Sequence, residues 1–178
     1  MERVTLEQWK AAAETHTHLP FALRVEGVVP PTAWQPHLGP DSLLLESARG
    51  GNYTIYVPQV LERLIFPTGE GEPVLARLRE YFARHNAPRF SGLPPFTGGL
   101  VGCFSYDMAR QIERLPSTAQ DDLGLPVAAF AVADELLVFD LRAGALFVIV
   151  VAETAGSEPL DERYAKTRTR AEALLSHW

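Results

Sequence analysis

Two strand-like runs flank a pair of glycines in the stretch Asp41-Ser-Leu-Leu-Leu-Glu-Ser-Ala-Arg-Gly-Gly-Asn-Tyr-Thr-Ile-Tyr-Val57. Glycine adopts positive φ angles without a steric penalty, so Gly50-Gly51 suits the tight turn of a hairpin. The stretch predicts a strand over 43–48, a turn at the glycines and a second strand over 53–57. A hairpin of this kind favours an antiparallel sheet over alternating βαβ units.

Further strands and helices surround this hairpin. Helices are predicted from Thr5, where Gln8 completes a capping box, from Pro73, and over 108–114 and 160–177. Strands are predicted in the remaining apolar stretches, at 21–29, 60–66, 100–106, 127–133, 135–141 and 145–152. The result is an α+β fold with a largely antiparallel β-sheet of about seven to eight strands, in one sheet or two packed sheets, and about four helices.

The composition is that of an ordinary soluble domain. Of the 178 residues, 47% are apolar and 21% are charged, which predicts one domain over 1–178 with a conventional core. The formal charge of −6 and the lack of Lys and Arg clusters disfavour nucleic acid as a partner. The only cysteine, Cys103, lies among apolar residues and glycines, so we expect a buried, inert thiol in a reducing compartment.

No segment has the pattern of an export signal or a membrane span. The first residues lack the apolar run of a signal peptide. The most apolar segment, 145–152, is far shorter than the roughly 20 residues that cross a bilayer. We therefore expect a cytoplasmic protein that does not associate with membranes.

Reactive side chains do not form a complete catalytic or metal site in the sequence. The glycine pairs lack the flanking residues of a nucleotide-binding loop, and no Gly-x-Ser-x-Gly elbow occurs. His16 and His18 lack further ligands at metal-site spacing and fit a solvated helix end. Asp121 and Asp122 fit a solvated turn. We predict no catalytic residue, no metal site and no cofactor in this chain.

Glu46 and Ser47 are polar residues inside an apolar strand. Adjacent strand residues point to opposite faces, so one of the two faces the apolar side unless a bulge or an edge intervenes. Unpaired burial of either group would cost about 1–3 kcal/mol. Hydrogen bonds to neighbouring backbone would account for both. The alternative is a small amino-acid pocket, in which Glu46 meets an ammonium group, Ser47 meets a carboxylate and Leu43 to Leu45 form an apolar wall.

A second glycine-marked block reads Pro94-Pro-Phe-Thr-Gly-Gly-Leu-Val-Gly-Cys-Phe-Ser-Tyr-Asp107. Together with the hairpin block and Asp121-Asp-Leu-Gly-Leu-Pro126, it closely resembles the N-terminal region of component I of the anthranilate synthase and aminodeoxychorismate (para-aminobenzoate) synthase family. The resemblance covers about residues 43–151. It implies a non-catalytic domain, because the family's chorismate and magnesium site lies in a large C-terminal domain that this chain does not contain.

The resemblance also implies a set of partners and a ligand site. The whole enzyme would aminate chorismate with ammonia from a glutamine amidotransferase subunit, so the isolated chain is expected to be inactive. Its partners would be the C-terminal chorismate-binding domain, the amidotransferase subunit and an amino-acid effector. The residues that match the family's tryptophan pocket are Leu45, Glu46 and Ser47. Magnesium would belong to the absent catalytic domain.

Details of the two blocks bear on the branch of the family. The short turn from Ala48 and the segment Ser105–Arg110 resemble the para-aminobenzoate type of folate biosynthesis, whereas Tyr56 to Gln59 departs from the family pattern. We take para-aminobenzoate synthase component I as the first interpretation. The alternatives are the same domain of anthranilate synthase component I, where the pocket serves feedback inhibition in tryptophan biosynthesis, and a stand-alone module that binds an aromatic amino acid.

Overall fold

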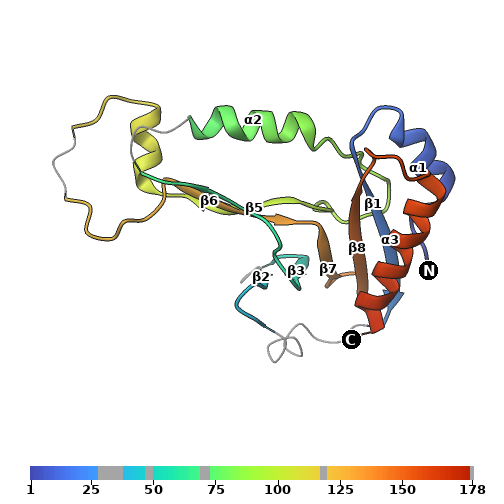
Figure 1. Cartoon of the computed structure of the whole chain (residues 1–178). Coiled ribbons are helices and arrows are strands. Elements are labelled where there is room, and N and C mark those ends of the chain that lie inside the picture. The colour runs from blue at the N-terminus through green and yellow to red at the C-terminus, as the bar shows by residue number, and fades with distance from the viewer. Residues whose placement is uncertain (28–37, 47–49, 69–72, 117–119, 177–178) are drawn as a thin grey trace.

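The computed structural model of the chain describes residues 1–27, 38–46, 50–68, 73–116 and 120–176. Within these residues, eight strands form two antiparallel sheets, which four helices accompany. Figure 1 shows the smaller sheet beneath α2 at one end of the molecule and the larger sheet beside α1 and α3 at the other. The predicted α+β fold with antiparallel sheets is confirmed.

The larger sheet has the strand order β1-β8-β7-β3-β2 and the smaller sheet the order β4-β6-β5. The strands are β1 (His18–Glu26), β2 (Leu43–Glu46), β3 (Tyr53–Val57), β4 (Arg63–Phe66), β5 (Gly99–Phe104), β6 (Ala128–Ala133), β7 (Glu135–Asp140) and β8 (Ala145–Glu153). The helices are α1 (Leu6–Ala13), α2 (Val74–Arg84), α3 (Leu160–Ser176) and the 3-10 helix η2 (Tyr106–Gln111).

The predicted hairpin is present as β2 and β3. Leu43 pairs with Val57 and Glu46 pairs with Thr54, while Gly50 has a φ of +65°. The strand predicted over 43–48 is described as far as Glu46, because 47–49 lie outside the described residues. β2 is an edge strand, so only β3 pairs with it.

Asp134 is the only residue between β6 and β7. β6 is the middle strand of the smaller sheet and β7 belongs to the larger one, so the chain changes sheets at this residue. The Asp134 carbonyl accepts a hydrogen bond from the Val151 N–H at 2.8 Å. This one-residue connection sets the two sheets beside each other.

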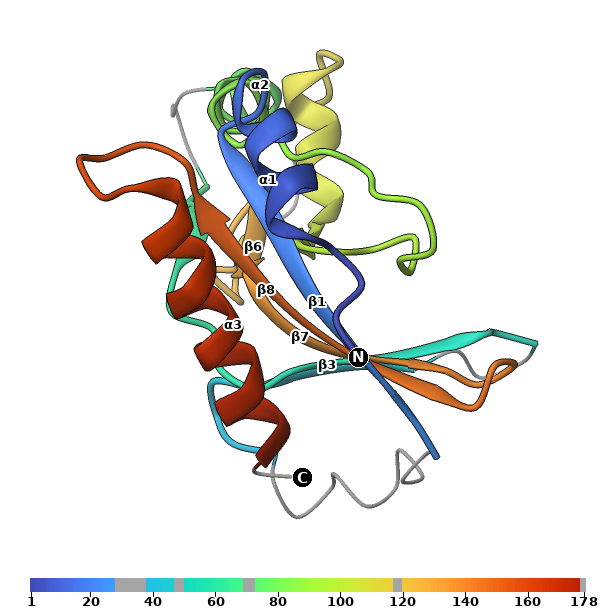
Figure 2. The ribbon, with the colours of Figure 1, turned by 90° about the vertical axis from the view of Figure 1, so that its right-hand side faces the viewer.

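Two helices cover one face of the larger sheet near β1 and β8 (Figure 2). Thr5 caps α1 as predicted: its hydroxyl accepts from the Gln8 N–H, and the Gln8 side chain accepts from the Thr5 N–H. Tyr164 of α3 meets Trp9 edge to face at a centroid distance of 5.1 Å and Phe21 at 5.3 Å. These aromatic contacts join both helices to β1.

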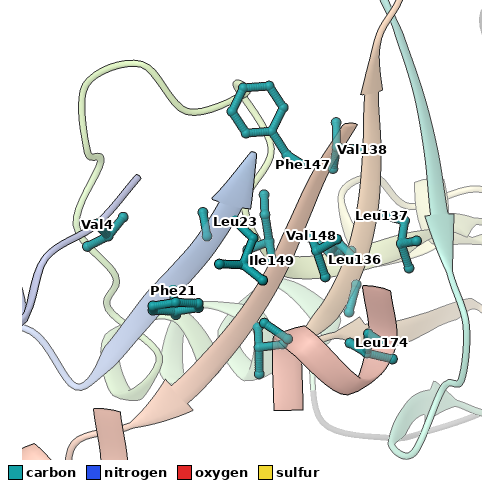
Figure 3. Packing of buried hydrophobic residues seen from close by; sticks show 14 of the residues in the cluster. Val4, Phe21, Leu23, Leu136, Leu137, Val138, Phe147, Val148, Ile149 and Leu174 are labelled. Carbon is teal, nitrogen blue, oxygen red and sulfur yellow. The ribbon is translucent and has the colours of Figure 1, made fainter. Parts of the chain in front are cut away.

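The main core includes both faces of the central strands. Residues 145–150 of β8 are all buried, and Figure 3 shows labelled side chains of β1, β7 and β8 together with Leu174 of α3. Phe90, Leu93 and Phe96 pack against the same core. A smaller core lies under α2, where Val74 and Leu78 form a cluster with residues that include Met108 and Phe130.

Cys103 is exposed, so the expectation of a buried thiol is wrong. Cys103 and Ile65 both pair with Ala129, so they lie on the same face of the smaller sheet. Ile65 on this face is 61% exposed. The core beneath α2 uses the opposite face, through Phe66 and Phe130. No described element buries Cys103. The prediction failed because apolar neighbours in the sequence do not show which face of a sheet is covered.

Gly102 is required by close packing between β5 and β6. A Cβ atom at this position would lie 2.0 Å from the Ala129 carbonyl oxygen and 2.7 Å from the Phe130 Cα. Both are backbone atoms of the paired strand, so they cannot move without disturbing the ladder. Only glycine therefore fits at position 102 without displacing one of the two strands.

Gly102→Ala should reduce the free energy of unfolding by about 1–3 kcal/mol, since the added methyl group forces β5 away from β6. Gly39→Ala is the matched control, because nothing lies within 4 Å of a Cβ at Gly39. Urea unfolding followed by circular dichroism measures both variants. Equal midpoints for Gly102→Ala and the wild type would contradict the close approach.

Candidate functional site

Two of the predicted ligand residues, Leu45 and Glu46, lie on β2, which is the last strand of the larger sheet in the described part of the chain. Leu45 pairs with Ile55 and Glu46 with Thr54. Ser47 lies outside the described residues, so the structure tests nothing about its role. Leu45 and Glu46 line none of three surface pockets found among the described residues.

Glu46 is exposed, although it lies on the same face as Thr54 and Phe139, which are buried. An edge strand has no neighbour on one side, so a side chain there reaches water even on an apolar face. The edge position of β2 thus accounts for a carboxylate on the apolar face. Its exposed carboxylate is accessible to a ligand or to a partner surface.

The apolar wall predicted from Leu43 to Leu45 is divided between two faces. The pairs Leu43 with Val57 and Leu45 with Ile55 lie on one face, whereas Leu44 lies on the other with Tyr56. Leu43 and Leu45 are half-buried. One face of β2 thus presents a partly open apolar strip beside Ile55, and Glu46 is on the opposite face.

A second group of reactive side chains lies where the C-terminus of α2 meets the start of β1. The His85 ring stacks on the Tyr81 ring with centroids 3.7 Å apart, and the centroid of the His18 ring lies 4.5 Å from that of His85. The His85 Nδ1 lies 2.8 Å from the Tyr81 carbonyl oxygen. The three rings form a wall that lines two neighbouring pockets.

Backbone contacts hold this ring stack in place. The Thr17 hydroxyl donates to the Arg84 carbonyl at 2.6 Å and accepts from the Asn86 N–H at 2.9 Å. The Asn86 carbonyl accepts from the His18 N–H at 3.0 Å, and Thr154 at the end of β8 donates to the Thr17 carbonyl. Hydrogen bonds thus join the end of α2 to the start of β1, and the start of β1 to the end of β8.

Burial and charge alter the acidity of this group. Burial raises the pKa of Tyr81 to about 12, helped by the carboxylates of Asp134 and Glu62. Burial also raises the pKa of Asp134, while His85 acts in the opposite direction. For His18, burial and the charge of His85 lower the pKa, and Glu153 opposes this effect. Each shift disfavours the charged form of its side chain.

Sequence reasoning missed this group. His18 was predicted to be solvated, but it is half-buried and stacked, because it opens β1 instead of ending α1. Two signals were present in the sequence. His85 follows Tyr81 by one helical turn, and the carboxylates Asp134 and Glu135 interrupt two apolar strand runs, just as Glu46 interrupts its own.

Asp121 forms a turn, as predicted. Its carboxylate accepts from the N–H groups of Leu123 at 3.3 Å and Gly124 at 2.9 Å. Within the described ranges, no cluster of three or more His, Cys, Asp or Glu side chains is arranged to hold a metal ion. The helices in the same ranges are too short or too polar to span a membrane.

His18 should make stability depend on pH. Its pKa in the folded state lies below the ordinary value of 6.5, so the unfolded chain binds the proton more tightly. The free energy of unfolding should therefore fall as pH decreases below about 6.5, until the folded-state histidine is itself protonated. His18→Gln should weaken this fall, and His16→Gln is the matched control. Urea unfolding between pH 7.5 and 5 measures it (roughly the range in which histidine titrates), and equal slopes for His18→Gln and the wild type would refute the role of His18.

Comparison with known proteins relates the chain to one group of enzymes. No family model matches the sequence. Anthranilate synthase component 1 of Streptomyces coelicolor is 46% identical over 123 residues, which are 65% of this chain and 23% of that protein. The protein of the same name from Mycolicibacterium smegmatis is 30% identical over 183 residues, which are 91% of this chain and 34% of that protein.

A solved structure has a similar fold. Anthranilate synthase component I from Streptococcus pneumoniae TIGR4 aligns with a TM-score of 0.57 at 23% identity, over 84% of this chain and 34% of the other. This likeness concerns the fold alone. The chain spans 23% of the Streptomyces relative and 34% of the Mycolicibacterium relative, so most of each relative has no counterpart in it.

Proposed function

We propose that this chain, a relative of the N-terminal region of the anthranilate synthase component I family, is the N-terminal part of such a component I. The supporting observation is sequence similarity, which covers up to 91% of the chain. Proteins of that name from Streptomyces, Pseudomonas aeruginosa and Mycolicibacterium are among the relatives. The whole enzyme would aminate chorismate to anthranilate, with ammonia from a glutamine amidotransferase subunit.

The branch of the family changes from the first interpretation. The sequence blocks favoured the para-aminobenzoate type, whereas the relatives at 46%, 35% and 30% identity are all named anthranilate synthase component 1. The turn that suggested the other branch includes 47–49, which lie outside the described residues. We therefore rank anthranilate synthase first and aminodeoxychorismate synthase second.

In this proposal the chain supplies scaffold, partner surface and half of an effector site. The chemistry would require a further domain that holds chorismate and magnesium. The strip of Leu43 and Leu45 beside Ile55 is half-buried, and Glu46 is exposed at the sheet edge. An open edge of this kind is suited to being covered by a neighbouring domain. Glu46 and Ser47 would then take part in binding an amino acid such as tryptophan.

The first test is catalytic. The full-length protein of the natural reading frame should convert chorismate, ammonia and Mg²⁺ to anthranilate, which is followed by its fluorescence. The 178 residues alone should give no turnover, because the chemistry would require the further domain and the described part of the chain holds no cluster of three or more His, Cys, Asp or Glu side chains that could bind a metal ion. Aminodeoxychorismate as the product would select the second branch. Turnover by the isolated chain would refute its non-catalytic role.

The second test concerns the effector. In the full-length enzyme, Glu46→Ala and Ser47→Ala should each weaken tryptophan binding about 10-fold or more, since each loses a hydrogen bond to a charged group of the ligand. Glu7→Ala, an exposed carboxylate on α1, is the matched control. Calorimetry measures the dissociation constants. Unchanged affinity in both Glu46→Ala and Ser47→Ala would eliminate the effector site but leave the catalytic proposal intact.

A further inference from the structure

A pocket of about 540 Å³ lies between the end of α2, the start of β5 and the residue that joins the two sheets. Aromatic side chains contribute much of its lining, namely Tyr81, Phe82, His85, Phe90 and Phe96, and the carboxylate residue in the wall is Asp134. It is a different place from β2, because neither Leu45 nor Glu46 lines it. The proposed function makes no use of it.

Asp134 has no hydrogen bond or ion pair from its side chain to any other described residue. The residue is exposed, but the protein atoms around its carboxyl group still raise its pKa. The charge of His85 lowers this pKa, whereas Glu62 and Glu135 raise it. The carboxylate is thus both open to a ligand and set in the wall of the pocket, where a cation could pair with it.

The charges around the pocket favour a cation over an anion. The C-terminal end of α2 carries the negative end of the helix dipole. The His85 Nδ1 faces the Tyr81 carbonyl oxygen at 2.8 Å, so that nitrogen is not directed to Asp134. Arg89 and His18 also line the pocket: Arg89 is exposed, as Asp134 is, and burial favours the neutral form of His18. The faces of aromatic rings attract cations as well.

We propose that this pocket binds an organic ammonium ion that carries an aromatic body, with the ammonium group on the Asp134 carboxylate and the body against the aromatic lining. The volume is within the range of small-molecule sites, and the combination of apolar walls with one charged group is typical of them. Free aromatic amines and aromatic amino acids share this ammonium chemistry. The inference does not rest on the proposed function.

The probes are three ligands with the same ring: phenethylamine, phenylalanine and 3-phenylpropionate. Phenethylamine should bind the wild-type chain saturably in an NMR titration, and 3-phenylpropionate should not, since it has no ammonium group. Phenylalanine separates the two sources: binding equal to the amine indicates an amino-acid site, and weaker binding indicates a site for free amines. No saturable binding of either ammonium ligand would overturn the proposal.

Asp134→Asn should weaken binding of the ammonium ligands about 10-fold or more, because the charge-assisted hydrogen bond is lost. Asp122→Asn, in the wall of another pocket, is the matched control and should bind like the wild type. Affinity of the wild type should also fall as the solution is acidified through the raised pKa of Asp134. Equal affinity of Asp134→Asn and the wild type would overturn the proposal.

The stability of Asp134→Asn distinguishes lost binding from lost folding. Because the folded-state pKa of Asp134 lies above the ordinary value of 3.8, its ionised form destabilises the fold at neutral pH. Without ligand, Asp134→Asn should therefore unfold at the same or a higher temperature than the wild type at pH 7. A lower unfolding temperature would show that the carboxylate serves the fold, which also contradicts the proposal.

Discussion

The single-residue connection between β6 and β7 is the constraint on which the arrangement of the two sheets depends. Two strands joined by one residue cannot fold back as a hairpin, since even the tightest hairpins need about two loop residues. The chain must therefore continue from one sheet into the other at Asp134. His85, at the end of α2, lies near enough to this corner for its charge to act on Asp134. It also creates the pocket lined by Tyr81 and Phe96.

Local features of the fold could be predicted from the sequence because their causes are local. The Thr5 capping box and the β2–β3 hairpin with its glycine turn depend on residues within a few positions of one another. The order of the strands depends on pairing between distant segments, which periodicity does not report. The exposure of Cys103 was missed for this reason, since it follows from which face of the smaller sheet α2 covers.

The candidate sites show the same division between local and distant causes. The sequence singled out Glu46 as a carboxylate in an apolar strand, and its exposure results from the edge position of β2. The group of His18, His85 and Asp134 unites β1, α2 and the junction of the sheets, and no motif spans such distances. The first site was singled out by the resemblance of its motif to a known family. Only the packing of the chain points to the second.

The pairing of β1 has a consequence for how the protein is made. His18 pairs with Glu153, and among the described strands only β8 lies next to β1 in the larger sheet. On the ribosome, the apolar side chains of β1, such as Phe21, emerge long before their partner strand does. Hairpins such as β2–β3 and β7–β8 can form as they emerge, whereas the β1–β8 pairing closes a loop that contains most of the chain. The nascent chain thus exposes the apolar side chains of β1 until β8 has left the ribosome.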